Sequence, residues 1–390
     1  MKKTILLLLS LSLVLFSCTK QDSVYKEFVV EGGRIYPAKA INVQAIAGFQ
    51  RVTIKWDKPT DPAVKTTRLY WNNYRDSVDV AYVNGKAEHT ITDLEDRSYT
   101  FWVRNFDANN NKSLDVEISA SPYGDNWLIS HAERSFRQAK NYGDSTVVTF
   151  SKSTFQMATT KVRYFNKAGN KVESRGIGPE EDAIVLYDAM PGKYIDFKSA
   201  YVPDGGVDTV WTASWTKADR PIVYPLDTKD WTIKATSGQI NGDYVPELVF
   251  DGLRDVNTSR YYSSRQTANR RDFPKILSID THKDGEQYVI TDFDFWLDPT
   301  NKNNRFIKDF AFYVGDSEYD PDAGADYADI FGNYVLRTSL VRDDFYSEVT
   351  INKAVAGRYI ALAFISSFSG YGYIDLWELV PYGYLESEAE

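Results

Sequence analysis

Few side chains in this chain have the type and spacing that catalysis or metal binding requires. Three histidines occur among 390 residues, and no two of them lie at the spacing of a metal-ligand pair. No glycine-rich phosphate loop, nucleophile elbow or Ser-His-Asp set is found. We therefore expect that this chain is not an enzyme on its own. The histidines are His89, His131 and His282.

Acidic side chains are abundant, with 54 aspartates and glutamates and a net charge of −9. A pair of carboxyl groups can act as acid and base in glycoside hydrolysis. Asp292 with Asp294, and Asp343 with Asp344, form such pairs in the sequence. Clusters of this kind usually lie on solvated faces or in turns, and we expect the same here.

The single cysteine, Cys18, closes a short basic and apolar leader. The apolar part, residues 5–16, is too short to span a bilayer as a helix and has the length of a signal-peptide core. Residues 15–18, Leu-Phe-Ser-Cys, resemble the lipobox of bacterial lipoproteins. The alternative is an ordinary signal peptide that happens to contain a cysteine.

The lipobox resemblance implies that residues 1–17 are removed, that Cys18 is lipidated, and that residues 18–34 form a linker after the anchor. Attachment to the membrane would then depend on the acyl chains. No cysteine remains for a disulfide, a zinc site or a thiol nucleophile. The acidic composition provides neither an electrostatic footprint for nucleic acid nor a polybasic patch for lipid headgroups.

The elements that must position any binding residues are predicted to be strands. Aromatic residues make up 15% of the chain, and short Val/Ile/Thr/Tyr runs recur between turn residues. Residues 51–56 alternate polar and apolar side chains with period two, as in a half-buried strand. The strongest helical candidate is the segment 125–140. At this length we expect two or three domains.

Residues 35–122 resemble a fibronectin type III module. Strands are expected at 51–56 and 67–71, and Leu94 followed five residues later by Tyr99 resembles the tyrosine corner of that family. A weaker version of the pattern covers residues 123–220, followed by a proline-containing linker at 219–225. Trp71 and Trp102 could form a sugar platform, but we favour sheet cover for both.

Residues 225–385 resemble the discoidin domain, also called the coagulation-factor C-type or F5/8 type C domain. The resemblance rests on an ordered set of motifs that closes with Glu378-Leu-Val-Pro-Tyr-Gly383. It implies a jelly-roll sandwich with loops gathered at one end, and in bacteria such domains usually bind carbohydrate. The expected fold class is therefore all-β, with two tandem sandwiches followed by a jelly-roll head.

The family often holds a structural calcium ion beneath these loops. Calcium takes six to eight oxygen ligands, and here the resemblance points to Asp251, Asp255, Thr258 and Glu378. Leu253 and Arg254 lengthen the loop relative to the family, and Arg254 could supply positive charge in place of the ion. The alternative is an Asp-Gly turn beside a buried, hydrogen-bonded Glu378.

A sugar site needs an aromatic face and a few fixed polar groups. Tyr261 and Tyr262 stand where the family has a Trp-His or similar pair, and Phe368 and Tyr371 lie in a glycine-rich loop that we expect to be exposed. We favour the latter two. The candidate ligand-binding residues are Tyr261, Tyr262, Arg271 with its neighbour Arg270, Trp296, Arg305, Phe368 and Tyr371.

These observations predict a lipid-anchored, non-catalytic glycan-binding protein of the outer membrane that faces the cell exterior. The paired modules at 35–122 and 123–220 resemble those that open many surface lipoproteins of Bacteroidetes-type bacteria. This resemblance implies that the two sandwiches act as a spacer and that the head helps capture polysaccharide for an importer, with outer-membrane glycan-uptake proteins as partners. The alternative is an adhesion or scaffold lipoprotein whose head binds another protein.

Overall fold

The computed structural model describes residues 36–235, 244–254, 261–263, 273–282, 286–298, 306–323, 326–341, 345–351, 353–370 and 372–389, without the side chains of 261–263. The described chain is nearly all β, so the expected fold class is confirmed. It forms two compact units, residues 1–131 with 202–210 and residues 132–201 with 211–390. No helix among the described residues is long and apolar enough to cross a membrane. The expected leader and Cys18 lie outside the described residues.

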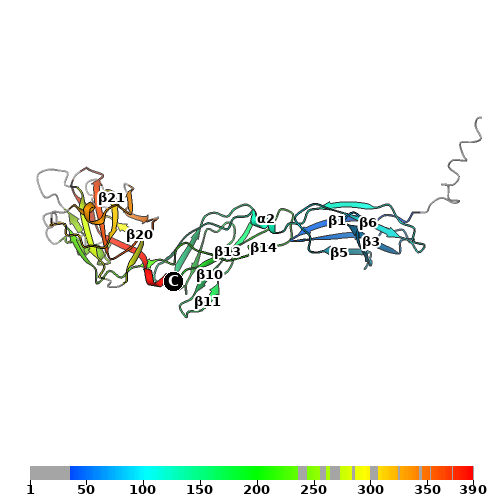
Figure 1. The fold of residues 1–390 in the computed structure, drawn as a ribbon, viewed down its shortest axis with the longest axis horizontal. Helices are drawn as coiled ribbons and strands as arrows, with labels where there is room; N and C mark the ends of the chain where they lie inside the picture. Colours follow the sequence, from blue (N-terminus) through cyan, green and yellow to red (C-terminus); the bar gives the residue numbers. More distant parts are fainter. Residues whose placement is uncertain are drawn as a thin grey trace, which may run out of the picture. The chain divides into compact units, whose positions relative to one another are not determined.

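The first unit contains a sandwich of two antiparallel sheets, ordered β1-β2-β5 and β4-β3-β6-β7 (Figure 1). In β2 the predicted alternation holds, since Val52, Ile54 and Trp56 are buried against the opposite sheet. The backbone N–H of Glu95 donates to the Tyr99 hydroxyl over 3.1 Å, which ties the loop to the strand as a tyrosine corner does. The strands are β1 (Ile41–Gly48), β2 (Arg51–Asp57), β3 (Thr66–Trp71), β4 (Asp76–Val80), β5 (Lys86–Ile91), β6 (Tyr99–Phe106) and β7 (Val116–Ala120).

The segment 125–140 is helical only over α2 (Asp125–Ile129), so the predicted helix is wrong beyond Ile129. From Phe136 the chain forms β8 (Phe136–Asn141), which pairs with β9. Ala139 and Lys140 are buried there. Local sequence gives no strand signal in this stretch, and tertiary pairing overrides its weak helical preference.

The second unit contains another sandwich, with sheets β12-β9-β8 and β11-β10-β13-β14, to which β15 adds beside β13. Its core includes Phe150, Val162, Ile184 and Phe197. The strands after β8 are β9 (Thr146–Phe150), β10 (Met157–Phe165), β11 (Lys171–Glu173), β12 (Ala183–Leu186), β13 (Asp196–Tyr201), β14 (Val210–Trp211) and β15 (Thr216–Lys217).

The proline-containing segment 219–225 is not a free linker. Ile222 and Val223 are buried, and the Val223 N–H donates to the Ala139 carbonyl over 2.9 Å. The next two residues form β16 (Tyr224–Pro225), which pairs with β27. The prolines lie where no ladder N–H is needed, so they do not prevent this pairing.

The rest of the second unit is a two-sheet head, with sheet orders β16-β27-β20-β23 and β17-β19-β25-β21-β22 and a short β18-β26 pair. Its remaining elements are β17 (Thr232–Ala235), η2 (Pro246–Phe250), β18 (Tyr261–Ser263), β19 (Lys275–Asp280), β20 (Tyr288–Trp296), β21 (Ile307–Gly315), α3 (Tyr327–Phe331), β22 (Leu336–Ser339), β23 (Tyr346–Thr350), β24 (Ala356–Gly357), β25 (Tyr359–Ser367), β26 (Ile374–Leu376), β27 (Glu378–Leu385) and η4 (Glu386–Glu388).

Aromatic rings from the two facing sheets form the centre of the head core. Phe293 on β20 packs on Phe312 of β21 with ring centroids 5.1 Å apart, and Phe295 packs on Phe310 at 5.0 Å. All four side chains are at most 1% exposed. Edge-on and tilted pairs of this kind favour one relative position of the sheets, so they help fix the ends of β20 and β21.

Lys140 of β8 is a fully buried cation that contacts the outer face of the β20 sheet. Its Nζ donates to Asp294 over 3.0 Å and to Glu348 over 2.6 Å, and lies 3.8 Å from the ring centroid of Tyr382. Burial opposes the charge, but the hydrogen bonds and charges of Glu348 and Asp294 outweigh it and raise the pKa of Lys140.

The expectation that Asp292 and Asp294 lie on a solvated face is therefore wrong. Asp292 is 1% and Asp294 is 5% exposed. Asp292 accepts from the hydroxyls of Thr291 and Thr350 over 2.7 and 2.9 Å. Packing of β8 against the sheet covers Asp294, so its charge is matched by Lys140 rather than by water.

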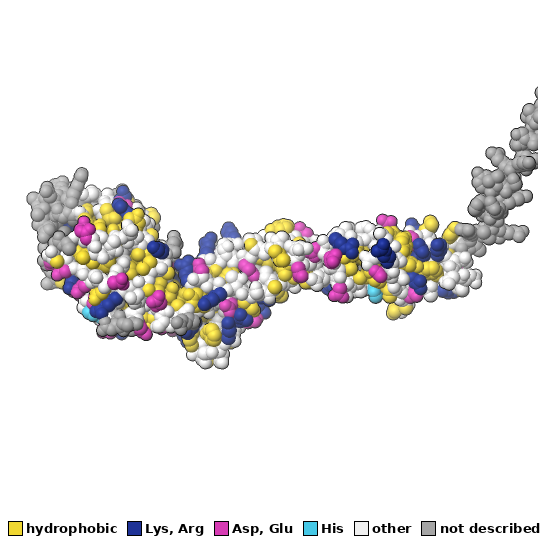
Figure 2. All heavy atoms as spheres, in the orientation of Figure 1, with side chains coloured by type: hydrophobic (Ala, Val, Ile, Leu, Met, Phe, Trp, Pro, Cys, Tyr) yellow, Lys and Arg dark blue, Asp and Glu magenta, His cyan; other side chains and the backbone are white. Residues whose placement is uncertain are grey.

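Elsewhere charged side chains are mixed on the surface, and Figure 2 shows both signs interspersed over the visible face. Some pair across strands, as Arg68 of β3 does with Asp79 of β4. Exposed pairs of this kind contribute about 0–1 kcal/mol each.

Replacement of Lys140 by Met is predicted to destabilise the second unit by about 3–5 kcal/mol, because it leaves Asp294 buried without its cation. Urea denaturation of the mature chain, followed by tryptophan fluorescence, measures this. Lys161→Met is the control, since the Lys161–Glu173 pair is exposed and spans 3.5 Å. Equal effects of the two substitutions would contradict the role given to Lys140.

Candidate functional site

Strand register places three sequence-distant side chains in one row at the end of the β20 sheet. Trp296, the last residue of β20, is directly opposite Glu378 of β27 on one side and Tyr346 of β23 on the other. Glu378 is buried, Trp296 is half-buried, and Tyr346 is 40% exposed. The row therefore runs from a buried carboxyl group to an exposed phenol.

Arg254 completes an aromatic shelf, which we define as Trp296, Tyr346 and Arg254. The two rings have centroids 4.7 Å apart at an interplanar angle of 49°, and the Arg254 guanidinium lies 4.7 Å from the Trp296 ring centroid. The Trp296 indole Nε1 is buried and has no hydrogen-bond partner among the described residues. The shelf thus combines the ring surface of Trp296 and Tyr346 with the exposed donors of the Arg254 guanidinium.

The turn after η2 holds the shelf against β27. Gly252 has φ +80°, a left-handed conformation that suits glycine. Its N–H donates to Glu378 Oε2 over 3.1 Å, and the Leu253 N–H donates to Asp251 Oδ1 over 2.9 Å. Burial, together with the nearby charge of Asp251, raises the pKa of Glu378 to about 7, although the Gly252 N–H and Arg254 act to lower it. The Glu378 carboxyl group therefore holds a proton to a higher pH than an exposed glutamate does.

Two of the four expected calcium ligands are described. Asp251 is exposed at the turn, and Glu378 is buried behind it. Asp255 and Thr258 lie outside the described residues. No group of three or more Asp, Glu, His or Cys side chains in the described part of the chain has the arrangement of a metal site. The Asp-Gly turn and the hydrogen bond from Gly252 to Glu378 are both present, and the calcium ion stays a prediction.

The other expected ligand-binding residues are described only in part. Tyr261 and Tyr262 lie on β18, opposite Leu376 and Asp375 of β26. Phe368 is half-buried and packs against the head core, and its N–H donates to the Phe306 carbonyl over 3.1 Å. Its ring does not project from the loop as we expected, because it packs against the head core. The expected binding residues that lie outside the described part of the chain are Arg270, Arg271, Arg305 and Tyr371.

Sequence reasoning missed Tyr346. Asp343 and Asp344 precede it, and in this stretch only their carboxyl groups were considered as functional. The Phe345-Tyr346 pair was not. The alternation of exposed and half-buried residues over β23 is a usable signal for a strand. Its pairing with β20, however, depends on tertiary structure, so Tyr346 could not have been placed beside Trp296.

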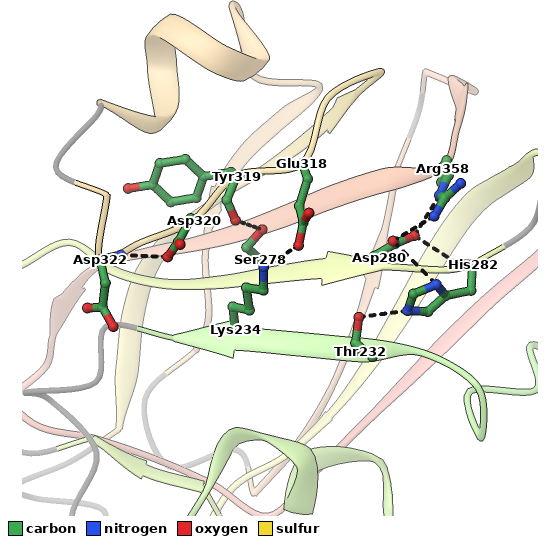
Figure 3. Close-up of polar contacts among 10 residues, drawn as sticks. All are labelled: Thr232, Lys234, Ser278, Asp280, His282, Glu318, Tyr319, Asp320, Asp322 and Arg358. Atoms are coloured by element: carbon green, nitrogen blue, oxygen red, sulfur yellow. Dashed lines mark hydrogen bonds and ion pairs between the residues drawn. The ribbon is translucent and has the colours of Figure 1, made fainter.

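A second polar cluster lies around the last residue of β19 (Figure 3). Thr232, Asp280 and Arg358 are near one another because β17 and β25 both flank the last residue of β19. His282 Nε2 lies 2.8 Å from the Thr232 hydroxyl, and its Nδ1 lies 3.4 Å from Asp280. This places a hydroxyl, an imidazole and a carboxylate in sequence, as in a hydrolase triad.

The pairing of Asp280 favours a structural role for this cluster. Arg358 Nε and Nη2 donate to the two Asp280 carboxylate oxygens, each over 2.8 Å, and these bonds lower the pKa of Asp280. Asp280 also accepts a hydrogen bond from the backbone N–H of His282 over 2.8 Å. This bond stabilises a turn in which His282 has φ +53°. The cluster therefore secures the end of β19. Lys234 with Glu318, and the Ser278 hydroxyl with the Tyr319 carbonyl, secure the neighbouring loop.

Residues 18–210 match the model of the family DUF4998, described as a domain of unknown function. The match ends at Val210, the first residue of β14. No curated protein sequence is significantly similar to the chain.

Several solved structures share local similarity with this chain. A SusE-like protein is 11% identical over 90% of this chain and 100% of its own, with a TM-score of 0.34. The family 32 carbohydrate-binding module of C. perfringens NanJ, solved with galactose, is 16% identical over 41% of this chain and 99% of its own, with a TM-score of 0.32. The C-terminal domain of a Bacteroides fragilis chitobiase is 16% identical over 41% and 98%, with a TM-score of 0.31. At these TM-scores none of the similarities assigns a function to the chain.

The stability of the second unit is predicted to depend on the protonation of Glu378. Its folded pKa of about 7 lies above its unfolded value, so its contribution is fully present below about pH 4 and is lost as the pH rises through 7. The loss is about 3 kcal/mol. Urea denaturation at a series of pH values, in the presence of a chelator, measures it.

Glu378→Gln is the matched variant, because the amide keeps the shape and stays neutral. We expect its unfolding free energy to be flatter between pH 5 and 8 than that of the wild type. Parallel pH profiles for the two proteins would show that Glu378 is ionised in the folded state throughout this range.

Proposed function

We propose that this chain is a non-catalytic glycan-binding protein whose head binds carbohydrate at the aromatic shelf. The observation that carries the proposal is the juxtaposition of Trp296, Tyr346 and Arg254 at one end of the β20 sheet. Sugar rings have an apolar face that packs on aromatic rings and hydroxyls that pair with fixed polar groups. Tyr346 offers an exposed ring, and Arg254 offers guanidinium donors beside it.

Around this site we propose the following organisation. Cys18 carries a lipid anchor in the outer membrane, and residues 35–122 and 123–220 are fibronectin type III-like spacers that face the cell exterior. Residues 225–385 form a discoidin-like head that captures polysaccharide for a glycan-uptake system. What supports the spacers is the three-plus-four arrangement of strands and the Tyr99 corner of the first sandwich.

We further propose that the turn beneath the shelf holds a structural calcium ion. The donor set fits, because the buried Glu378 carboxyl group lies behind the exposed Asp251, and oxygen is the donor that calcium prefers. When bound, the ion would balance the charge of Glu378 and connect the 251–254 turn to β27. Asp255 and Thr258 are the further ligands that the family resemblance implies.

The shelf predicts that Trp296→Ala and Tyr346→Ala each weaken glycan binding by about tenfold or more, the equivalent of about 1.4 kcal/mol. The mature full chain is titrated against a panel of starch, galactan, xylan, mucin glycans and free galactose by affinity electrophoresis and calorimetry. Tyr334→Ala is the control, because Tyr334 is 52% exposed and precedes β22 away from the shelf.

Three outcomes separate the possibilities. Loss of binding in the shelf variants, with retention in the control, supports the proposal. Binding that is insensitive to both shelf variants places the site elsewhere and overturns it. Failure of the wild-type chain to bind any glycan would shift the function to adhesion through protein contacts.

Calcium is predicted to raise the urea midpoint of the second unit at pH 7.5 and a chelator to lower it, because binding to the folded state alone adds stability. Asp251→Asn and Glu378→Gln should each reduce this response, while Asp316→Asn should not. An unchanged midpoint with and without the ion would show that the Asp-Gly turn is self-sufficient.

A further inference from the structure

A second group of aromatic and polar side chains lies on the outer face of the first sandwich. The register of its four-stranded sheet brings Tyr70 of β3 opposite Trp102 of β6, and Trp102 opposite Glu117 of β7. Tyr74, in the turn after β3, stacks on Trp102 with ring centroids 4.5 Å apart at an angle of 22°. Trp71, by contrast, packs against the interior of the sandwich.

Hydrogen bonds hold these rings in place. The Trp102 indole N–H donates to Glu117 over 3.2 Å, and the Tyr74 hydroxyl donates to Asp115 over 2.7 Å. Arg104 pairs with Asp115 over 2.6 and 2.7 Å and lies 5.4 Å from the Tyr74 ring centroid. A ligand that uses Trp102 would therefore meet a side chain already fixed in orientation, at a small cost in entropy.

Trp102 forms one wall of an open pocket of about 580 Å³, within the size range of small-molecule sites. The β3–β4 turn and the start of β6 form its other walls. The exposed side chains of Asn73 and Arg75 make no hydrogen bond to another described residue, so their amide and guanidinium groups are available to a ligand. The principal lining residues are Asn72, Asn73, Arg75, Arg97, Thr100 and Trp102.

The backbone of the β3–β4 turn is strained in a way that shapes this pocket. Asn72, Asn73 and Tyr74 are consecutive non-glycine residues with φ of +49°, +54° and +64°. The left-handed region costs about 1–2 kcal/mol per residue, and only asparagine among these tolerates it readily. Such conformations persist where the surroundings enforce them and are concentrated at functional sites. Here the turn places Tyr74 on Trp102 and both amides at the pocket.

We propose that this pocket is a second carbohydrate-binding site, on the first sandwich, for the same polysaccharide that the head binds. The inference rests on the proposed glycan-binding function. The indole of Trp102 can pack on a sugar ring, and the Asn73 amide and Arg75 guanidinium can pair with its hydroxyls. A polymer with many repeats can occupy both sites of one chain, which raises affinity through effective concentration without a new contact at either site.

The test uses the mature full chain with the polysaccharide that binds most tightly in the panel of starch, galactan, xylan and mucin glycans. Trp102→Ala and Arg75→Ala are each expected to weaken binding of this polymer about tenfold. Tyr36→Ala is the control, since Tyr36 is 53% exposed and lies outside the pocket. Arg75 is an exposed turn side chain, so its variant keeps the fold even if loss of Trp102 disturbs the sheet.

The same substitutions in a Trp296→Ala/Tyr346→Ala background separate the two sites. We expect weak residual binding of the polymer in that background and its loss when Trp102→Ala or Arg75→Ala is added. If the head variant alone abolishes binding and neither Trp102→Ala nor Arg75→Ala changes the wild-type affinity, the second site is overturned while the head site stands. If the wild-type chain binds none of the polymers, both proposals are overturned.

Discussion

The position of the candidate site depends on the packing of four phenylalanines between the two sheets of the head. Phe293 on Phe312 and Phe295 on Phe310 fix how far β20 and β21 extend past one another. Residues on β20 alternate between the two faces of the sheet, so the same register that buries the phenylalanines presents Trp296 on the outer face at the strand end. Glu378 and Tyr346 flank Trp296 because β27 and β23 pair with β20 on either side.

Charge burial is the second constraint on this sheet. Asp292 and Asp294 lie on the outer face of β20, and both are buried from solvent. Hydroxyl groups pair with Asp292, and Lys140 from the preceding sandwich pairs with Asp294. A buried ion of either sign costs several kcal/mol unless it is matched, so the contact of β8 with the β20 sheet depends on the pairing of Lys140 with Asp294. The adjacent Glu378 obeys the same rule with a proton or, as we propose, with calcium.

Strand positions were predicted well where alternation and burial agree. Residues 51–56 and 67–71 show this, since each expected strand lies within an observed one, β2 or β3. Prediction failed at residues 136–141. The charged side chains of this segment did not indicate a strand, but the segment forms β8, in which Lys140 is buried. Local propensity contains no information about the pairing of Lys140, because its partners Asp294 and Glu348 lie 154 and 208 residues away in the sequence.

The candidate site was predictable in part. Trp296 and Glu378 were named from the sequence, the first as a ligand-binding residue and the second as a calcium ligand. Their adjacency, and the presence of Tyr346 beside them, follow only from strand pairing. Phe368 was misjudged in exposure because a glycine-rich loop says little about whether a ring turns toward the core or away from it.

The central claim, that Trp296 contacts bound carbohydrate, is tested most directly by its indole N–H signal in nuclear magnetic resonance. The chain has nine tryptophans, and Trp296→Phe assigns the one signal of interest. On titration with a glycan that binds, we expect the Trp296 signal to shift and to saturate over the same concentrations as binding. A glycan that binds while the Trp296 signal stays fixed would contradict it.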